Sequence, residues 1–507
     1  MSLLFISALA WKAALTIALM LGIAAIRTLI NMFLPPAHLR HLPKIPTFAF
    51  MFSIIRSEGN DSREKRILLP ILDKKGMATI WFNGTWSVLL SDPAYVKTFM
   101  TNADTIPKDI RLLKQNKLKC KMFGLDNLGI KNKEEWRYHR KFLNPAFRHT
   151  FPTQMFGECT HELFEILDQA ILCELPVEIP PLMSRLSLDA LGKYIFKFNF
   201  NALKGAGDEY CQKYNAMMKG MFNPLFIFFP KISFLPLPVV RRLSKTIDDV
   251  NELLFGIIER KKKELDAGLY KDADEHEKDV LTYMIEGLAT EDESKWSKEQ
   301  IRADLLILFG AGHESTQGSL SLVLYFLAVH PEYQELARQE ADSILSEFDR
   351  MHIPNVEQCR HMKYIDCIIK ESLRLHPPAS LIGPRVLETP MKIGDETFPQ
   401  GTYLLANLFA LQNSSRTWKD PERFWPERFL PENNPPRDAW MPFSGGPRIC
   451  LGMQFSLTEQ RVVVSMLLRN YTWSLPADSP HANGLKTNPI FGPVHLQNLK
   501  LNFKRRN

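Results

Sequence analysis

The sequence predicts a mainly α-helical protein with a minor β region (α+β), and three observations support this fold class. From about Lys133 to Leu375, apolar residues recur three and four positions apart, which is the spacing of helices with one buried face. Strand-like segments bounded by turn residues lie before this span and again after it. With 507 residues, of which 45% are hydrophobic, the chain can bury a large core.

The first strand-like segment is a predicted hairpin. Two apolar runs, Ala78–Phe82 and Trp86–Leu90, flank Asn83-Gly84. Asn-Gly favours a two-residue turn, because both central positions of that turn need positive φ. The following Asp92-Pro93 predicts the start of a helix, since an aspartate can cap the first turn and a proline fits its first position.

The helical pattern is most regular over Asp248–Leu265 and Ala303–Leu327. A third stretch, Lys261–Glu299, overlaps the end of the first and is rich in lysine, aspartate and glutamate. We therefore expect it to be a solvated helix end followed by a loop.

Strand-like sequence returns after His376-Pro377-Pro378. Gly394-Asp395 and Gln400-Gly401 are turn signals that divide this region into short strands. The β region is therefore drawn from two distant parts of the sequence.

Residues 1–34 are predicted to be a single-pass membrane anchor, followed by a proline-rich connector over residues 35–50 and a folded domain over residues 51–507. Leu3–Ile26 is almost wholly apolar and long enough to cross a bilayer, with Lys12 as the one interruption. Basic residues after such a run are typical of the cytosolic side, so we expect the folded domain on the cytosolic face of a membrane. These basic residues are Arg27, Arg40 and Lys44.

Charge and cysteine usage limit the partners of the chain. The formal net charge of +7 is spread along the sequence without a dense basic arm, so we expect no nucleic-acid partner. A membrane surface, an acidic protein or simple solubility each fit this charge. The seven cysteines include no Cys-x-x-Cys pair, which argues against a structural zinc site, and their odd number argues against a disulfide framework. The aromatic, proline-broken residues 222–240 are either a loop folded onto the core or a second contact with lipid.

The most informative motif is the run Phe443–Gly452, which places Cys450 in a glycine-containing turn two residues after Arg448. A thiolate needs a nearby cation or dipoles. Gly446 and Gly452 would let the backbone approach a flat cofactor where any side chain would collide. Taken alone, Cys450 would more simply be a buried free cysteine beside a turn. The spacing of Phe, Gly, Arg, Cys and Gly together favours a thiolate presented to iron.

This spacing resembles the haem-binding loop of the cytochrome P-450 monooxygenases of the eukaryotic, membrane-anchored microsomal type. With Phe455, Leu457, Thr458 and Glu459 it looks most like fungal enzymes that oxidise alkanes and fatty acids. The resemblance implies the cytochrome P-450 fold, with haem b (iron protoporphyrin IX) between a long central helix and the cysteine loop. It also implies that the Cys450 thiolate binds the iron and favours cleavage of the oxygen–oxygen bond on the opposite face.

Further cofactor residues follow from the same resemblance. In the loop itself, Phe443 covers the sulfur side and Arg448 pairs with an anionic group of the haem. Trp136 and Arg140, one helical turn apart, resemble the segment that binds the haem propionates, and both side chains are donors, as carboxylates require. Arg385 is a third cation of this set. Without the resemblance, each arginine would be interpreted as a surface residue.

The segment Ala311–Thr316 lies on the predicted central helix. Alone it is more simply a packed helix containing a glycine, although its small residues could open a groove and its hydroxyl could bond to the carbonyl four residues earlier. It resembles the oxygen-activation segment of the same family, which makes Glu314 the acid and Ser315 the alcohol of proton delivery. The family more often has threonine at the position of Ser315, and serine keeps the hydroxyl but loses the methyl group.

Residues on the same helical face as Ser315 are expected at the substrate pocket. Leu308 and Ala311 are the apolar candidates. Asp304 shares this face but is as readily a solvated or structural polar group.

Glu371 and Arg374 lie three apart on a helix that ends before His376. Such a pair is common as a surface ion pair. By the resemblance it joins Arg428 in a buried ion network that fixes the loop behind the haem, which is a structural role.

The resemblance implies a haem-thiolate catalytic domain that inserts one oxygen atom of O₂ into an apolar substrate. Electrons would come from NADPH through an NADPH-cytochrome reductase, with cytochrome b5 as a second donor, at the endoplasmic reticulum membrane. Fatty acids, alkanes, sterols and terpenoids are all compatible substrates. Two other functions remain open: a reductase-independent haem-thiolate isomerase or dehydratase of peroxides, and a non-catalytic haem-binding membrane protein. Consumption of NADPH with purified reductase separates the three.

Overall fold

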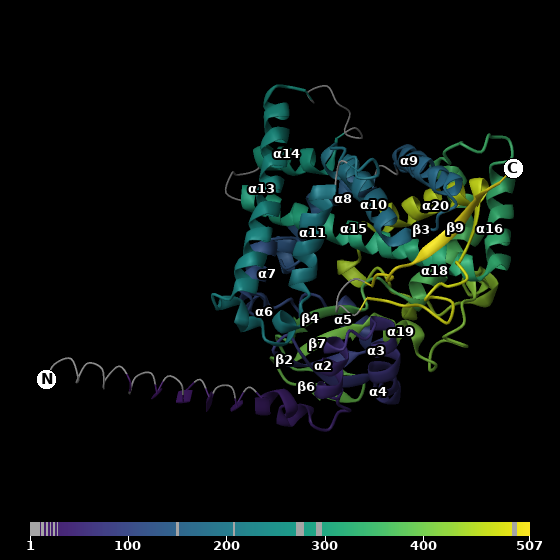
Figure 1. Ribbon diagram of the computed structural model, residues 1–507. Helices are drawn as coiled ribbons and strands as arrows, with labels where there is room; N and C mark the ends of the chain where they lie inside the picture. The colour runs from purple at the N-terminus through teal and green to yellow at the C-terminus, as the bar shows by residue number, and fades with distance from the viewer. Residues whose placement is uncertain are drawn as a thin grey trace.

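The computed structural model describes residues 29–506, apart from 149–151, 206–207, 270–277, 291–296 and 489–493, together with scattered residues between 11 and 27. Helices predominate in this part of the chain, and most of the strands gather in one region beside the N-terminal helices (Figure 1). The predicted fold class, mainly α with a minor β region, is confirmed.

The helices vary from a single turn to 32 residues. Those of the first half are α2 (Thr47–Ile55), α3 (Asn60–Arg63), α4 (Leu69–Lys75), α5 (Pro93–Thr101), α6 (Ile110–Lys114), α7 (Lys117–Phe123), α8 (Lys133–Arg148), α9 (Thr153–Leu172), α10 (Ile179–Phe196), α11 (Asp208–Met221), α12 (Pro224–Phe228) and α13 (Pro238–Asp266). Those of the second half are α14 (Val280–Thr290), α15 (Lys298–Val329), α16 (Pro331–Ile344), α17 (Val356–His361), α18 (Lys363–Leu375), α19 (Leu408–Asn413) and α20 (Met453–Asn470).

The main sheet joins the two distant β regions. Its four strands lie in the order β1 (Met77–Phe82), β2 (Thr85–Leu90), β7 (Tyr403–Asn407) and β4 (Leu381–Val386). The predicted hairpin is confirmed: β1 and β2 are antiparallel, and the turn between them has φ of 51° at Asn83 and 79° at Gly84. Because β2 pairs in parallel with β7, the N-terminal hairpin and the segment after the long helical span form one sheet.

Two smaller sheets complete the β structure of the described residues. One contains β3 (Val177–Glu178), β9 (Lys500–Arg505) and β8 (Tyr471–Ser474). The other is the hairpin β5 (Met391–Ile393) and β6 (Glu396–Phe398), which turns at Gly394 with φ of 61°, as the Gly-Asp signal predicted.

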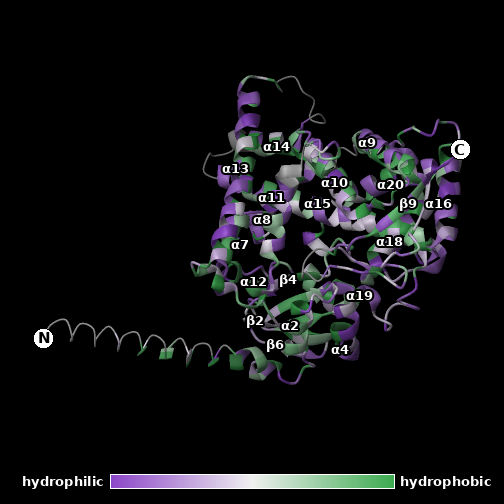
Figure 2. Ribbon diagram, in the orientation of Figure 1, coloured by the Kyte–Doolittle hydropathy of each residue, from purple (hydrophilic) through white to green (hydrophobic). Residues whose placement is uncertain are grey.

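The central helix α15 positions the rest of the helical part. It begins with a capping box, in which the Gln300 amide donates to Ser297 Oγ at 3.2 Å and the Ser297 amide donates to Gln300 Oε1 at 2.5 Å. Most side chains from Ile301 to Leu327 are buried, because α10, α13, α18 and α20 surround the helix. Hydrophilic residues lie instead along the outer helices α13 and α16 (Figure 2).

One prediction in the helical span is wrong. Within the stretch expected to be a solvated helix end and a loop, residues 280–290 form α14, with Val280 and Leu281 buried. Lys261 is also buried, and its Nζ lies 2.6 Å from Asp279 Oδ2. A short apolar run lies within this mostly charged stretch, and it packs against α8, α10 and α13. This packing stabilises a helix that the polar composition of the stretch did not predict.

The N-terminal anchor lies largely outside the described residues. No helix of the described residues combines the length and apolarity that crossing a bilayer requires. Contacts with the folded body begin near residue 31: Trp86 Nε1 donates to the Asn31 carbonyl oxygen at 2.6 Å, and Met32 is buried. The proline-rich connector joins the sheet where the Ile45 amide donates to the Thr79 carbonyl oxygen at 2.8 Å.

The aromatic residues 222–240 divide into two halves. Phe226 and Phe228 of α12 are buried in the core. The next residues form an exposed apolar surface, which we call the 234–239 patch. Its members are Phe234 (55% exposed), Leu235 (51%), Leu237 (37%) and Val239 (43%).

Candidate active site

The cysteine loop lies between a single 3-10 turn, Gly446–Arg448, and α20. The Cys450 amide donates to the Phe443 carbonyl oxygen at 2.9 Å, which closes the loop around the thiol. Burial raises the pKa of the Cys450 thiol, while a hydrogen bond with the Gly452 backbone and the charge of Arg140 act in the opposite direction. Phe443 packs beside Trp440 at a ring distance of 6.2 Å.

The two glycines of the loop differ in their surroundings. Gly446 has φ of 63°, and a Cβ there would lie 2.6 Å from the Met100 carbonyl oxygen. The backbone of α5 is therefore sufficient to require glycine at this position. A Cβ at Gly452 would meet no atom within 4 Å, so this residue borders open space.

Cys450, two residues before Gly452, is also not covered by protein atoms. Cys450 is exposed, although the surrounding protein atoms raise the pKa of its thiol. Exposure and a raised pKa are compatible if the thiol faces an opening that protein atoms surround. On the buried helix α15, Ala311 is likewise exposed, and Leu308 and Ser315 are half-buried. Thr316 Oγ1 lies 3.2 Å from Ser456 Oγ of α20, which brings α15 alongside the helix that follows the cysteine.

Two arginines lie at the cysteine loop. Arg448 stacks over the Trp136 ring at 4.1 Å and donates to the Lys131 carbonyl oxygen. Arg140 Nη2 donates to the Ile449 carbonyl oxygen at 3.0 Å, one residue before the cysteine. Burial, followed by the charge of Arg385, lowers the pKa of Arg448 to about 10. The structure thus brings Trp136, Arg140 and Arg448 together around the loop.

Sequence reasoning missed a fourth cation, Lys108. Its backbone forms an isolated antiparallel bridge with Arg385, and its Nζ donates to the Gly129 carbonyl oxygen. Burial, then the charges of Arg448 and Arg385, lowers the pKa of Lys108 to about 7. No motif marks this lysine, because only the tertiary fold brings it to the other cations.

This arrangement fits haem b. Several positive groups lie close together and repel one another, which an anionic group would relieve. The Cys450 thiol is exposed, a Cβ at Gly452 would meet no atom, and Ala311 is exposed on α15. A flat ligand with two carboxylates and a metal that accepts sulfur meets these requirements.

The acid and alcohol positions of α15 have distinct environments. Ser315 Oγ donates to the Ala311 carbonyl oxygen at 2.6 Å, the backbone contact that a helix hydroxyl favours. Glu314 is buried, and its Oε2 lies 3.4 Å from His495 Nε2. The His495 side chain is 23% exposed, so it connects the buried carboxyl group to the surface. No sequence motif marks this histidine, which lies about 180 positions after Glu314 in the chain.

Asp304 has a structural role. It is fully buried, and its Oδ1 accepts from the Leu128 amide at 2.5 Å. Its Oδ2 lies 3.1 Å from Nδ1 of the buried His139. Asp304 therefore ties α8 to α15 and does not line the open space with Ser315.

Glu371, Arg374 and Arg428 form one buried network. Arg374 binds the Glu371 carboxylate through two nitrogens at 2.7 and 2.9 Å, and Arg428 Nε lies 3.4 Å from Glu371 Oε1. The two arginines also donate to carbonyl oxygens of residues 412, 419, 420 and 421. The network joins α18 to the segment that leads to the cysteine loop.

Comparison with known proteins agrees with this geometry. Residues 72–495 match the family model Cytochrome P450. Cytochrome P450 3A9 of Rattus norvegicus is 30% identical over 356 residues, which are 68% of this chain and 69% of the relative. Cytochrome P450 4F8 of Homo sapiens is 29% identical over 395 residues, 75% of each chain. A zebra fish cytochrome P450 structure with abiraterone has the same fold, with a TM-score of 0.72, 18% identity and coverage of 87% of this chain and 99% of that one.

These relatives are vertebrate proteins and do not support the fungal likeness of the cysteine loop. The family match covers the cysteine loop, the central helix and the cations around them. The chain belongs to the cytochrome P450 family of monooxygenases, whose members hold haem.

Proposed function

We propose that this chain hydroxylates an apolar substrate, using one oxygen atom of O₂ and electrons that NADPH supplies through a reductase. The observation that carries the proposal is the exposed Cys450 in a loop crowded by cations, together with the exposed Ala311 on the otherwise buried helix α15. Haem b bound through Cys450 would supply the activation of O₂. Trp136, Arg140, Arg385, Arg448 and Lys108 would hold its propionates.

Proton delivery is the task of α15 in this proposal. Ser315 Oγ donates its proton to the Ala311 carbonyl oxygen, and rotation of this hydroxyl would present the proton to the exposed face of α15. Glu314 replaces the proton, because its carboxyl group is buried one residue away and contacts the partly exposed His495. The path therefore runs from solvent through His495 and Glu314 to Ser315.

The substrate is expected to be apolar. Leu308 and Ala311 present hydrocarbon to the open space, and no described charged side chain stands between them on this face of α15. A fatty acid, alkane, sterol or terpenoid each fits such a lining.

The proposed setting is the endoplasmic reticulum membrane. Residues 1–34 would anchor the chain, residues 35–50 would connect, and residues 51–507 would form the haem-thiolate domain on the cytosolic face. The 234–239 patch supports a second lipid contact. NADPH-cytochrome reductase, with cytochrome b5 as a second donor, would bind the cytosolic side.

The two alternative functions account less well for Glu314 and Ser315. Rearrangement of a peroxide needs no external proton, and a haem-binding scaffold needs no open apolar face beside a hydroxyl group.

The test uses full-length protein in vesicles with purified reductase and a panel of apolar lipids. We expect a thiolate-type carbon monoxide difference spectrum, substrate-dependent NADPH consumption, and loss of both in Cys450→Ser. Turnover of a lipid peroxide without reductase would favour the isomerase instead, and a bound haem without any NADPH consumption across the panel would favour the scaffold.

A further inference from the structure

A second cavity, of about 450 Å³, lies between α10, α11, α13 and α15. Its wall on α15 consists of Leu306, Phe309 and His313. At about 100° per residue, these positions point away from the face that carries Ala311 and Ser315. The central helix therefore separates this cavity from the space beside Cys450.

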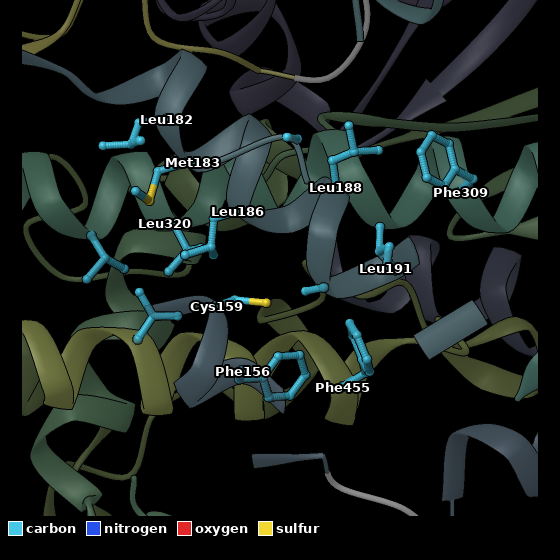
Figure 3. Packing of buried hydrophobic residues seen from close by; sticks show 14 of the residues in the cluster. Phe156, Cys159, Leu182, Met183, Leu186, Leu188, Leu191, Phe309, Leu320 and Phe455 are labelled. Carbon is cyan, nitrogen blue, oxygen red and sulfur yellow. The ribbon is translucent and has the colours of Figure 1, made fainter. Parts of the chain in front are cut away.

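The cavity has the size and lining of a small-molecule site. Volumes of roughly 300–1,000 Å³ with apolar and aromatic walls are typical of such sites. The Tyr214 ring meets Phe309 edge-on at 5.5 Å, and the Phe196 ring lies 6.1 Å from Phe309. Figure 3 shows Leu188 of α10 beside Phe309 of α15, both of which line the cavity.

Two polar atoms of the cavity wall are buried and have no hydrogen-bond partner among the described residues. They are Tyr214 Oη and His313 Nδ1, on side chains that are 4% and 1% exposed. The Tyr214 hydroxyl sits close to α15, since a Cβ at Gly310 would lie 2.6 Å from it. Buried polar atoms are rarely left unpaired, so both call for a ligand group.

The protonation states of the two groups define that ligand. His313 Nε2 lies 2.8 Å from Ser184 Oγ and 3.1 Å from the Ser184 carbonyl oxygen. A hydroxyl oxygen can accept and a carbonyl oxygen can only accept, so a proton on Nε2 satisfies both contacts, and Nδ1 then presents a lone pair. Burial lowers the pKa of His313 to about 4, which keeps the ring neutral. Burial also raises the pKa of Tyr214, so its hydroxyl keeps its proton and donates. The cavity thus offers one acceptor and one donor.

We propose that this cavity is a second binding site for an apolar alcohol. The ligand hydroxyl would accept from Tyr214 Oη and donate to His313 Nδ1, and its hydrocarbon body would lie against the aliphatic and aromatic walls. A charged ligand is disfavoured, because the residues of α13 at the mouth carry both signs. Lys245 and Glu252 are exposed there and Asp249 is half-buried.

The test measures binding at this cavity with the haem side blocked. Full-length holoenzyme is saturated with an imidazole compound that binds the haem iron, and 1-octanol is then titrated by calorimetry. We expect one equivalent of 1-octanol to bind. 1-Methoxyoctane, which can accept but not donate, should bind about 2- to 10-fold more weakly because it leaves His313 Nδ1 unpaired.

Two variants locate the site. Tyr214→Phe should weaken 1-octanol binding about 2- to 10-fold without loss of folding, since it removes a hydroxyl that has no partner in the protein. Leu253→Trp should abolish binding by filling the cavity. Tyr325→Phe is the matched control, because it alters a buried tyrosine of α15 that does not line the cavity.

Three outcomes would overturn the proposal. These are equal affinities for the alcohol and the ether, an unchanged 1-octanol affinity in Tyr214→Phe, and a crystal structure with 1-octanol in which only a water bridges Tyr214 and His313. Monooxygenase activity is not measured, so failure of this site leaves the proposed function untouched.

Discussion

At the scale of single residues, the burial of two ionisable groups near the cysteine loop is not fully offset by the charges around them. Burial raises the pKa of the Cys450 thiol and lowers that of Lys108, and in both cases it disfavours the charged form. A metal beside the sulfur and carboxylates beside the lysine would reverse both effects. The charges that the protein itself does not neutralise are therefore those that haem can neutralise.

Lys108 makes haem binding depend on pH. Its pKa is about 7 without an anion, and propionates would raise it. On binding above pH 7 Lys108 then takes up a proton, whereas the Cys450 thiol, whose pKa is raised, releases one when its sulfur binds iron. The contribution of Lys108 alone should therefore be constant well below pH 7 and should lower haem affinity roughly fivefold between pH 7 and 8. Titration of the haem-free protein with haem at several pH values measures this.

A matched lysine provides the control for this prediction. Lys108→Gln should remove the Lys108 contribution to the pH dependence of haem affinity, which is measured as the ratio of the affinities of the unchanged protein and the variant at each pH. Lys119→Gln should retain it, because Lys119 is half-buried, desolvation lowers its pKa to about 8, and no charge of the cation group acts on it. The same slope in Lys108→Gln as in the unchanged protein would rule out the role of Lys108.

Ser315 is predicted to control proton delivery. Ser315→Ala removes the hydroxyl without leaving a buried group unpaired, because the Ala311 carbonyl keeps its helical bond. Hydroxylated product should form roughly 10²-fold more slowly while NADPH consumption continues, and Ser315→Thr should restore product formation. Product formed per NADPH consumed is the measurement, and equal coupling in the alanine variant would exclude this role.

At the scale of elements, local signals predicted the structure well. The Asn83-Gly84 turn forms the expected hairpin, and Asp92 caps α5 by accepting from the Ala94 amide at 3.0 Å. The turn and the cap each depend only on residues close together in the sequence, so a single sequence predicts them. The α14 helix, the bridge between Lys108 and Arg385, and the contact of Glu314 with His495 depend on distant segments, which a single sequence does not disclose.

The cysteine loop offers a contrast between two glycines. Gly446→Ala should destabilise the haem-free protein by about 2–4 kcal/mol, because it forces a left-handed alanine against the Met100 carbonyl oxygen. Gly452→Ala should leave its stability unchanged, since the added Cβ meets open space. Thermal unfolding of the haem-free variants measures both effects.

Haem loading distinguishes the roles of the two positions. If the cofactor passes close to Gly452, Gly452→Ala should lower haem content despite normal stability. Full haem content in this variant would show that the open space beside Gly452 is not where the cofactor lies.

Over the whole molecule, the resemblance in a few motifs predicted which residues the fold brings together. Arg448, Arg140 and Trp136 come from two distant segments and meet around one loop, and Glu371, Arg374 and Arg428 meet behind it. No sequence motif predicted the cavity between α11 and α15. Its polar residues, Tyr214 and His313, lie on two different helices, and they come together only when these helices pack.

Attachment of the whole molecule to a membrane is predicted to use two regions. Because Asn31 and Met32 already contact the body, a truncation should remove only residues 1–28. This shortened chain should still bind neutral vesicles through the 234–239 patch, since each large apolar side chain contributes roughly 1.5–3 kcal/mol when it leaves water. Phe234→Ser with Leu235→Ser should lower its partitioning at least about tenfold in vesicle sedimentation, whereas Leu172→Ser, at an exposed leucine of α9, should not. Equal partitioning of the two variants would mean that the patch does not face lipid and that the N-terminal segment alone attaches the protein.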